Sequence, residues 1–328
     1  MNQYLHIASV LLFTHALFAQ STKGLTGKRD TGYTTFKAYN DIKKSHPDVA
    51  ISGVSDKTPP SVKEQRDIVY NTVGDRKLLL DAFYPKKKMR KARPAILIIH
   101  GGGWRTGNRQ QHISLAQHLA ALGYVCFTPE YRLSTEALYP AAVHDLKAAL
   151  RWMRANAKKY KIDTNHIATV GFSAGGQLSA LLGTTGDNPE FEGTSGNVGH
   201  STKVNAIVDI DGILAFIHPE SGEGDDSRST SAATYWFGYS KTENRELWQA
   251  ASALNHVDAQ TPPTLFLNSG VDRMHAGRTD YLKKLETYKT YSEVHTFPNA
   301  PHSFCLFNPW FEPTVQYIDE FLKNVFSK

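Results

Sequence analysis

Two glycine-rich motifs in this chain are suited to nucleophilic chemistry. Residues 171–175 read Gly-Phe-Ser-Ala-Gly and residues 100–104 read His-Gly-Gly-Gly-Trp, each directly after a short apolar run. In Gly-x-Ser-x-Gly the chain turns so tightly from strand into helix that glycine is needed on both sides, which leaves the serine hydroxyl exposed. The upstream glycines let backbone N–H groups approach a developing oxyanion. Together the motifs predict a serine nucleophile, Ser173, and its oxyanion hole.

A serine hydroxyl needs a base, and a neutral imidazole held by a carboxylate serves near neutral pH. When a strand-turn-helix elbow carries the serine, the acid and then the histidine follow it in the chain. Asp272 follows the apolar run 264–267 and His302 follows the run 293–297, so both are expected at carboxyl ends of neighbouring strands. We expect His100 to orient the glycine loop. Residues near other strand ends remain as rivals: His275 and His295 for the base, and Asp209, Asp211 and Asp280 for the acid.

Strand and helix patterns alternate along most of the chain. Residues 67–70 and 77–84 predict a β-hairpin around Gly74 and Asp75, and apolar runs at 95–99, 124–129, 167–170, 204–210, 264–267 and 293–297 predict further strands. Helical spacing separates them. The pattern predicts an α/β fold with a mostly parallel, doubly wound sheet and an antiparallel N-terminal hairpin at one edge. The long segment at about 211–260 is expected to be a cap beside the active site.

The amino-terminal region has a different composition. Residues 7–18 are uncharged and too short to span a bilayer, and small Ala19 follows them, which predicts a cleaved export signal at 1–19. The alternative is a buried first helix. Residues 20–62 are expected to be an irregular lead-in, and residues 63–328 to form the catalytic domain. No other segment is apolar and long enough to cross a membrane, so we expect a secreted or periplasmic protein.

The overall composition excludes some functions. The 328 residues are 41% hydrophobic and 21% charged, as in soluble globular proteins, with a formal net charge of +6. The basic residues are scattered and not interleaved with aromatic residues, so nucleic acid is not an expected partner. The two cysteines, Cys126 and Cys305, are either two buried thiols or a disulfide. The fourteen histidines include no pair at helical ligand spacing joined to a suitable third ligand, so no metal or other cofactor is expected.

From about residue 64 to its end the chain resembles the α/β-hydrolase esterases, in the branch with His-Gly-Gly-Gly-Trp and Gly-Phe-Ser-Ala-Gly-Gly motifs. Motif order, strand context and spacing all agree with that branch. The resemblance implies Ser173 as nucleophile, Asp272 as acid and His302 as base. It places the oxyanion donors on the backbone amides of three residues, Gly102, Gly103 and Ala174. Arg132, Asp145 and the Ile-Asp pair at 162–163 also resemble that branch, where they are structural.

A narrower resemblance concerns the substrate. Residues 300–304 (Ala-Pro-His-Ser-Phe) and 307–311 (Phe-Asn-Pro-Trp-Phe) are similar to exported bacterial esterases that remove methyl or acetyl esters from plant cell-wall polysaccharide, especially pectin. Arginines around the glycine and acid loops are candidates to bind uronate carboxylates, or else pair with local acids. Aromatic residues are candidates to stack on sugar rings, or else belong to the cap core. The arginines are Arg105, Arg109, Arg273 and Arg278, and the aromatic residues are Tyr235, Trp236, Trp248 and Trp310; Trp104 is a further candidate to bind substrate.

These features predict a secreted serine carboxylic ester hydrolase that works through an acyl-enzyme on a small-molecule or polysaccharide ester, with pectin favoured. Triad chemistry alone does not separate esters from amides, so a peptidase or amidase is an alternative. A non-catalytic binding module on the same fold is a weaker one, because all three triad members have candidates. The sequence does not indicate protein partners or oligomeric state.

Overall fold

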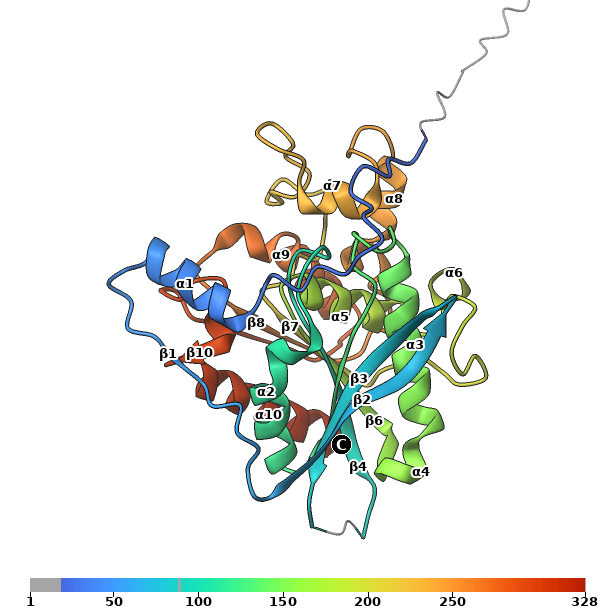
Figure 1. Ribbon diagram of the computed structural model, residues 1–328, viewed down its shortest axis with the longest axis vertical. Coiled ribbons are helices and arrows are strands. Elements are labelled where there is room, and N and C mark those ends of the chain that lie inside the picture. Colours follow the sequence, from blue (N-terminus) through green and yellow to red (C-terminus); the bar gives the residue numbers. More distant parts are fainter. Residues whose placement is uncertain (1–18, 88–89, 328) are drawn as a thin grey trace, which may run out of the picture.

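The structure is a computed structural model that describes residues 19–87 and 90–327. Its main element is an eight-stranded sheet in the order β2-β3-β5-β4-β6-β7-β8-β9 (Figure 1). Neighbouring strands from β5 to β9 run parallel, whereas β3 pairs antiparallel with both β2 and β5. The strands are β2 (Val62–Val73), β3 (Arg76–Pro85), β4 (Arg93–Ile99), β5 (Val125–Pro129), β6 (Ile162–Phe172), β7 (Ala206–Ile210), β8 (Thr264–Asn268) and β9 (Ser292–Thr296).

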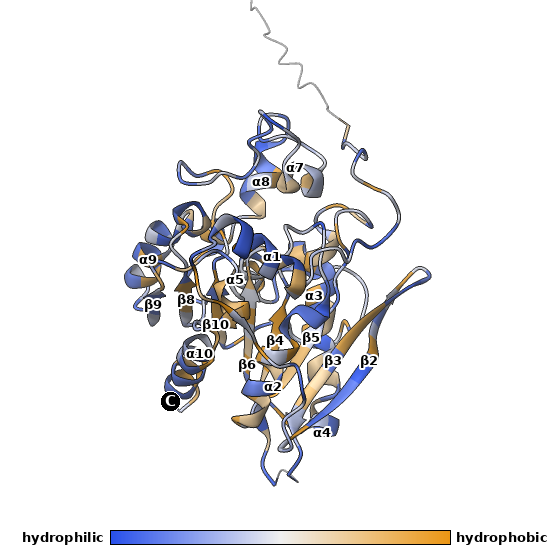
Figure 2. Ribbon diagram, turned by 60° about the vertical axis from the view of Figure 1, so that its left-hand side comes forward, coloured by the Kyte–Doolittle hydropathy of each residue, from blue (hydrophilic) through white to orange (hydrophobic). Residues whose placement is uncertain are grey.

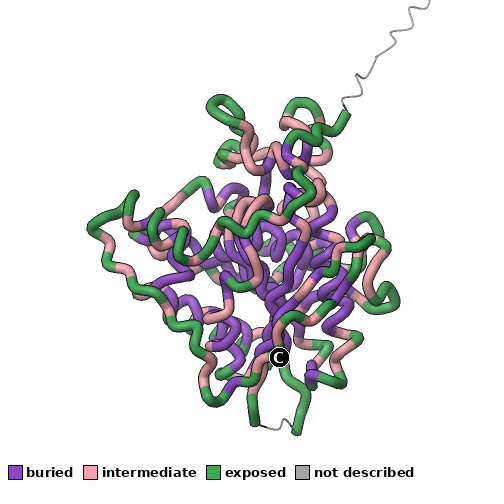
Figure 3. Tube along the Cα trace, viewed as in Figure 1, coloured by how far each residue is buried: buried purple, intermediate pink, exposed green. Residues whose placement is uncertain are grey.

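Helices cover both faces of the sheet, and the strands contribute side chains to two hydrophobic cores, one on each face. Along β4, Leu97 and Ile99 enter one core while Ile96 and Ile98 enter the other, as alternation along a strand requires. One core is closed by α3 (Ala141–Ala155), α5 (Ala174–Thr184) and α9 (Arg278–Thr287), and the other by α1 (Thr35–Ser45), α2 (Ile113–Ala121) and α10 (Phe311–Phe326). Apolar and buried residues accordingly gather along the central strands (Figures 2 and 3). The predicted fold class, an α/β-hydrolase fold with a hairpin at one edge, is confirmed.

The lead-in at 20–62 is more regular than expected. It contains helix α1 and a two-residue strand, β1 (Ser52–Gly53), which pairs with β10 (Phe307–Asn308). Helix α1 begins after Thr34, whose hydroxyl accepts a hydrogen bond from the Lys37 amide. It buries only Ala38 and Ile42, one turn apart. Such a short apolar stripe gives little periodic signal, so the sequence pattern missed this helix.

The segment 211–260 follows β7, and its two α-helices lie at one end of the molecule (top of Figure 1); we call this segment the cap. It contains α7 (Ala232–Phe237), α8 (Arg245–Ala250) and a 3-10 helix, η2 (Ala253–His256). Trp236 and Trp248 are fully buried and pack around Phe216. These two tryptophans are therefore core residues of the cap and are not available to stack on sugar rings, which is the second of the two predicted alternatives.

Residues 19–34, which we call the N-terminal strap, run along the cap before reaching α1 (Figure 1). The Ser21 amide donates to the Gly238 carbonyl, and the Gln20 side chain donates to the Phe237 carbonyl, both at the end of α7. The predicted export signal at 1–19 lies outside the described residues except for Ala19. The first contacts of the strap with the cap, at Gln20 and Ser21, thus come directly after the predicted cleavage position.

The structure also shows the state of the two cysteines and the character of the helices. Cys126 and Cys305 are both buried and free, so they are two separate thiols, and burial raises the pKa of each. None of the helices within 19–87 and 90–327 is long and apolar enough to cross a bilayer.

Candidate active site

Ser173 occupies the sharp turn between β6 and α5. Its backbone has φ 57° and ψ −122°, a conformation that few non-glycine residues adopt and that projects the side chain from the turn. A Cβ on Gly171 would lie 1.9 Å from the Gly175 carbonyl oxygen, and one on Gly175 would lie 2.2 Å from that of Ile99. Both glycines are therefore required by close backbone approach. The Ser173 amide is anchored by donating to the Ile210 carbonyl at 2.8 Å.

A histidine and a carboxylate extend from this serine in a line. His302 Nε2 lies 2.9 Å from Ser173 Oγ, and His302 Nδ1 lies 2.9 Å from Asp211 Oδ2. An ionised carboxylate only accepts hydrogen bonds, so Nδ1 carries the ring hydrogen and Nε2 of the neutral ring accepts the serine hydroxyl. This is the geometry that a serine nucleophile and its base require.

The acid in this line is Asp211, and the expectation of Asp272 is corrected. Asp211 directly follows β7, is fully buried, and its Oδ1 accepts a hydrogen bond of 2.7 Å from the Ser269 amide. Asp272 begins the 3-10 helix η3 (Asp272–His275), four residues beyond the end of β8, and is exposed. Both aspartates follow neighbouring parallel strands, so chain order alone did not distinguish them. The difference lies in how far each loop runs before the carboxylate.

Asp211 contacts two histidines. Burial by itself would raise the pKa of its carboxyl, but interactions with His275 and His302 outweigh burial and lower the pKa to about 2. His275 Nε2 lies 3.4 Å from Asp211 Oδ1, on the side away from His302. The carboxylate therefore stays ionised across the neutral range, as the orientation of His302 requires. His275, a rival for the base, instead lies behind the acid.

The expected oxyanion donors come from the glycine loop and from the residue that follows Ser173. Gly102 has φ +121°, and a Cβ there would lie 2.0 Å from the Thr106 carbonyl oxygen, so the tight loop requires glycine. Gly103 and Ala174 line the same cavity as Ser173. Within the described part of the chain, the amides of Gly102, Gly103 and Ala174 donate no hydrogen bond, which leaves them free for a substrate oxygen.

His100 and the N-terminal strap hold the glycine loop from behind. His100 is buried, its Nδ1 lies 2.8 Å from the Gly101 carbonyl oxygen, and burial lowers its pKa. Arg29 of the strap reaches this ring with Nη2 at 3.2 Å from Nε2, and also donates to the Gly107 carbonyl at 3.2 Å. Nε2 of a neutral ring accepts from the guanidinium. His100 therefore orients the loop, and the strap contributes a residue that the sequence patterns did not single out.

The strap also contacts the loop that carries His302. The Tyr33 hydroxyl lies 2.9 Å from Ser303 Oγ, one residue after the histidine. The Asp30 carboxylate accepts a hydrogen bond from the Thr106 hydroxyl at 3.1 Å. One segment of sixteen residues thus joins the cap, the glycine loop and the histidine loop.

A small cavity of about 50 Å³ opens at the serine. The cap contributes Glu223 to this cavity. The sequence patterns did not identify its carboxyl group, because Glu223 lies in an acidic, glycine-containing loop whose sequence does not indicate which side chains face the site. Burial raises the pKa of Glu223, and the positive charges of Arg273 and Lys241 partly oppose that increase. The cavity is lined by Gly103, Trp104, Ser173, Ala174, Ile213, Glu223, Ala232 and Met274.

The expected arginines divide into two groups. Arg109 forms ion pairs with three carboxylates, those of Asp67, Asp81 and Glu130, and its side chain is only 11% exposed. It is a structural residue, and the expectation that it binds substrate is corrected. Arg105 stacks on Tyr235, with its guanidinium carbon 4.1 Å from the ring centroid.

The other two arginines, Arg273 and Arg278, line a second hollow of about 340 Å³. Asp272, His275, Glu220 and Thr279 complete its lining. Met274 lies between two of these residues in the chain and lines the serine cavity, so the two hollows adjoin along η3. Arg278 also donates to the Asn268 side chain at the end of β8.

The two expected tryptophans at the site behave differently. Trp104 lines the serine cavity, stacks on Trp236 at 5.0 Å between ring centroids, and donates from Nε1 to Gln177 Oε1 at 2.9 Å. It is a fixed wall. Trp310 instead packs, half-buried, against the core beside α10. The structure does not bring Trp310 to the serine cavity or to the second hollow.

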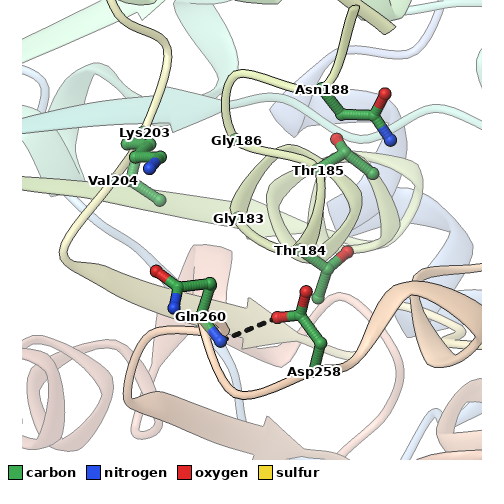
Figure 4. A pocket seen from close by; sticks show the side chains of 9 residues that line it. All are labelled: Gly183, Thr184, Thr185, Gly186, Asn188, Lys203, Val204, Asp258 and Gln260. Carbon is green, nitrogen blue, oxygen red and sulfur yellow. Dashed lines mark hydrogen bonds between the residues drawn. The ribbon is translucent and has the colours of Figure 1, made fainter. Parts of the chain in front are cut away.

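A further hollow of about 180 Å³ lies at the far end of α5 from Ser173 (Figure 4). Its lining includes Thr184, Thr185, Lys203 and Asp258, and the Gln260 amide donates to the Asp258 carboxylate. The eleven residues of α5 span about 16 Å, so this hollow is remote from the triad. Within the described ranges, no group of three or more His, Cys, Asp or Glu side chains is arranged to hold a metal ion.

Comparisons with known proteins identify a family and relatives of this chain. The family model BD-FAE matches residues 80–277, a stretch that contains the glycine loop, Ser173 and Asp211. Esterase LipC of Mycobacterium tuberculosis is 31% identical over 63% of this chain and 51% of its own length, and esterase LipQ of the same organism is 28% identical over 73% of this chain and 57% of its own. The chain thus spans about half the length of these two relatives.

Solved structures share the fold. A truncated carbohydrate esterase from gut microbiota superimposes with a TM-score of 0.67 at 23% identity, covering 83% of this chain and all of that one. Esterase 2 of Thermogutta terrifontis gives a TM-score of 0.67 at 24% identity, covering 81% of this chain and 95% of that one. At these identities the likeness is one of fold.

Proposed function

The chain belongs to the BD-FAE family of α/β-hydrolases, and from that membership and the geometry of its site we propose that it is a serine carboxylic ester hydrolase that works through an acyl-enzyme. The observation that carries the proposal is the line Ser173–His302–Asp211, with 2.9 Å at each step, beside amides that donate to nothing else. The esterase names of LipC and LipQ agree with it.

The proposed reaction has two halves. His302 Nε2 takes the hydroxyl proton as Ser173 Oγ attacks the ester carbonyl, and the amides of Gly102, Gly103 and Ala174 stabilise the oxyanion of the tetrahedral intermediate. His302 then returns the proton to the departing alcohol, which leaves the acyl group on Ser173. Water repeats the sequence with His302 as base and releases the acid. Asp211 stabilises the imidazolium that forms twice in the cycle.

We propose further that the enzyme is exported and removes methyl or acetyl esters from plant cell-wall polysaccharide, with pectin favoured. A cavity of about 50 Å³ has room for only a few water molecules, which suits a methyl or acetyl group and not a long acyl chain. The adjoining hollow with Arg273 and Arg278 could hold a sugar unit and its carboxylate. The carbohydrate esterase among the structures of the same fold is consistent with this substrate class.

Replacing the nucleophile tests the activity. Ser173→Ala should abolish turnover of p-nitrophenyl acetate and labelling by a fluorophosphonate, with an unchanged circular dichroism spectrum. Esterase 2 of Thermogutta terrifontis, which shares the fold, is phosphonylated by sarin, a reagent of the same type. Retained turnover in the variant would reject the assignment. Faster hydrolysis of an acetyl amide than of the matching ester would favour the peptidase or amidase alternative.

The substrate class is tested by separate product assays. The wild-type enzyme is incubated with methylated pectin, acetylated pectin and acetylated xylan, and released methanol and acetate are measured. Release from either pectin would support the role of Arg273 and Arg278, whereas acetate from neutral xylan alone would contradict it. No release from any of the three would remove the polysaccharide proposal while leaving the activity on small esters intact.

A further inference from the structure

One carboxylate at the site has no role in the triad. Glu223 comes from the cap loop and lines the same small cavity as Ser173. Its side chain is only 16% exposed. Among the described residues, no donor makes a hydrogen bond to its carboxylate oxygens; the nearest cation is Arg273, with Nη1 at 3.7 Å from Oε1. That separation is too long for a hydrogen bond.

An ionised carboxylate in this position lowers the free energy of unfolding. Taking a charged group out of water costs free energy unless hydrogen bonds or a close counter-ion replace the lost hydration. The Arg273 side chain is 56% exposed, so water screens its charge and it compensates only in part. Two carboxylates that are more deeply buried are well paired: Asp211 accepts from two sides, and Asp145 is held by the Arg132 side chain and amide. Glu223 therefore has unused acceptor capacity directed at the site where the substrate reacts.

The chemistry of such an acceptor limits its ligand. A carboxylate accepts hydrogen bonds from hydroxyl groups, and its two oxygens can take two neighbouring hydroxyls together. It repels an anionic group placed at the same point. The cavity is too small for a hydroxylated ring, so a hydroxylated alcohol half must extend out of it, toward the adjoining hollow with Arg273. The Glu223 carboxylate lines the cavity and also lies 3.7 Å from Arg273, so it stands beside that path.

We propose that Glu223 is a specificity-determining residue that accepts hydrogen bonds from hydroxyl groups of the sugar whose acetate ester is cleaved. This inference rests on the proposed esterase function and deepens it. It favours an acetate on a hydroxyl-rich alcohol over a methyl ester, because in a methyl ester the alcohol half has no hydroxyl to offer. Arg273 is placed to bind a carboxylate further along the same chain of sugars, beyond the point that Glu223 occupies.

The experiment compares two acetates on the same six-membered ring, one with free hydroxyl groups and a methoxyl group and one with neither. One is a monoacetylated methyl xyloside and the other is the acetate of 4-hydroxytetrahydropyran, which has the same ring without free hydroxyls. In the wild-type enzyme, kcat/KM for the sugar acetate should exceed that for the hydroxyl-free acetate by about 10- to 100-fold, since hydrogen bonds to a charged group are the strong ones. Glu223→Ala should reduce that ratio to near one, and Glu223→Gln should leave an intermediate ratio.

The matched control is Glu246→Gln, which changes an exposed carboxylate on α8 of the same cap and should keep the wild-type ratio. Fluorophosphonate labelling of each variant verifies a folded site. If Glu223→Ala keeps the preference for the sugar acetate, or lowers both rates equally, the inference is overturned. If the wild-type enzyme cleaves neither these acetates nor p-nitrophenyl acetate, the proposed function fails and the inference falls with it. The two failures are thus distinguishable.

Discussion

An aspartate follows each of the neighbouring strands β7 and β8 within four residues of the strand end, yet only one of these two aspartates reaches His302. Asp211 is the first residue after β7 and is buried with its carboxylate 2.9 Å from His302 Nδ1. Asp272 comes four residues after β8 and lies exposed at the start of η3. The β8 loop instead supplies a backbone amide, from Ser269, that holds the Asp211 carboxylate. One loop thus provides the acid and its neighbour positions it.

This difference shows how the position of a residue within a loop decides its chemistry. A carboxylate next to a strand end is held in the rigid and buried environment of the sheet, and its hydrogen bonds and nearby charges keep it ionised although water is excluded. A carboxylate several residues further reaches the surface, where water replaces those interactions. The same residue type at two adjacent strand ends can therefore be an orienting group or a solvated charge.

The largest expected effect separates the two aspartates by activity. Asp211→Asn should lower kcat by about 10³- to 10⁴-fold, because an amide no longer fixes the tautomer of His302 or stabilises its imidazolium. Asp272→Asn should leave kcat for p-nitrophenyl acetate within about 2-fold, as surface changes usually do. Steady-state kinetics on the two purified variants measures this. A severe loss in Asp272→Asn with a mild one in Asp211→Asn would reverse the assignment of the acid.

A smaller effect separates the aspartates by stability. The pKa of Asp211 is about 2 in the folded protein and 3.8 in the ordinary case, so its contribution is present above about pH 4 and is lost as the pH falls toward 2. The difference amounts to about 2 kcal/mol in all, with about half lost by pH 3. Urea unfolding between pH 6 and pH 3 should show that Asp211→Asn loses less stability on acidification than the wild-type protein. Equal acid dependence of the two proteins would contradict the low pKa.

The smallest expected effect concerns the histidine behind the acid. With p-nitrophenyl acetate, which needs only the serine cavity, His275→Gln should lower kcat by about 3- to 10-fold with little change in KM. A contact at 3.4 Å that steadies Asp211 is lost, while the serine cavity keeps its lining. The matched control is His295→Gln, since that residue lies on β9 beside Glu293. A rise in KM at constant kcat would instead assign His275 to substrate binding.

Local patterns predicted the parts of the molecule that local chemistry determines. The hairpin, the parallel strands and the elbow at Ser173 follow from alternation, apolar runs and glycines that no other residue can replace. The choice of Asp211 was not predictable in this way, because it depends on the relative lengths of two loops from different parts of the chain. Arg109 was misread for a similar reason: its partners Asp67, Asp81 and Glu130 lie 21 to 42 residues away in sequence.

The N-terminal strap affects how the activity of the protein responds to heating. Residues 19–34 lie outside the sheet, and most of their side chains are exposed or half-buried, so this stretch is expected to fray well below the temperature at which the two cores melt. Its detachment would free Arg29 from His100 and Tyr33 from Ser303 while the sheet stays intact. The protein should therefore lose activity at a lower temperature than the one at which it unfolds. Trimming the chain to begin at Thr34, which removes Arg29 and Tyr33 but keeps α1 and its N-cap, should produce the same folded form with reduced activity at room temperature.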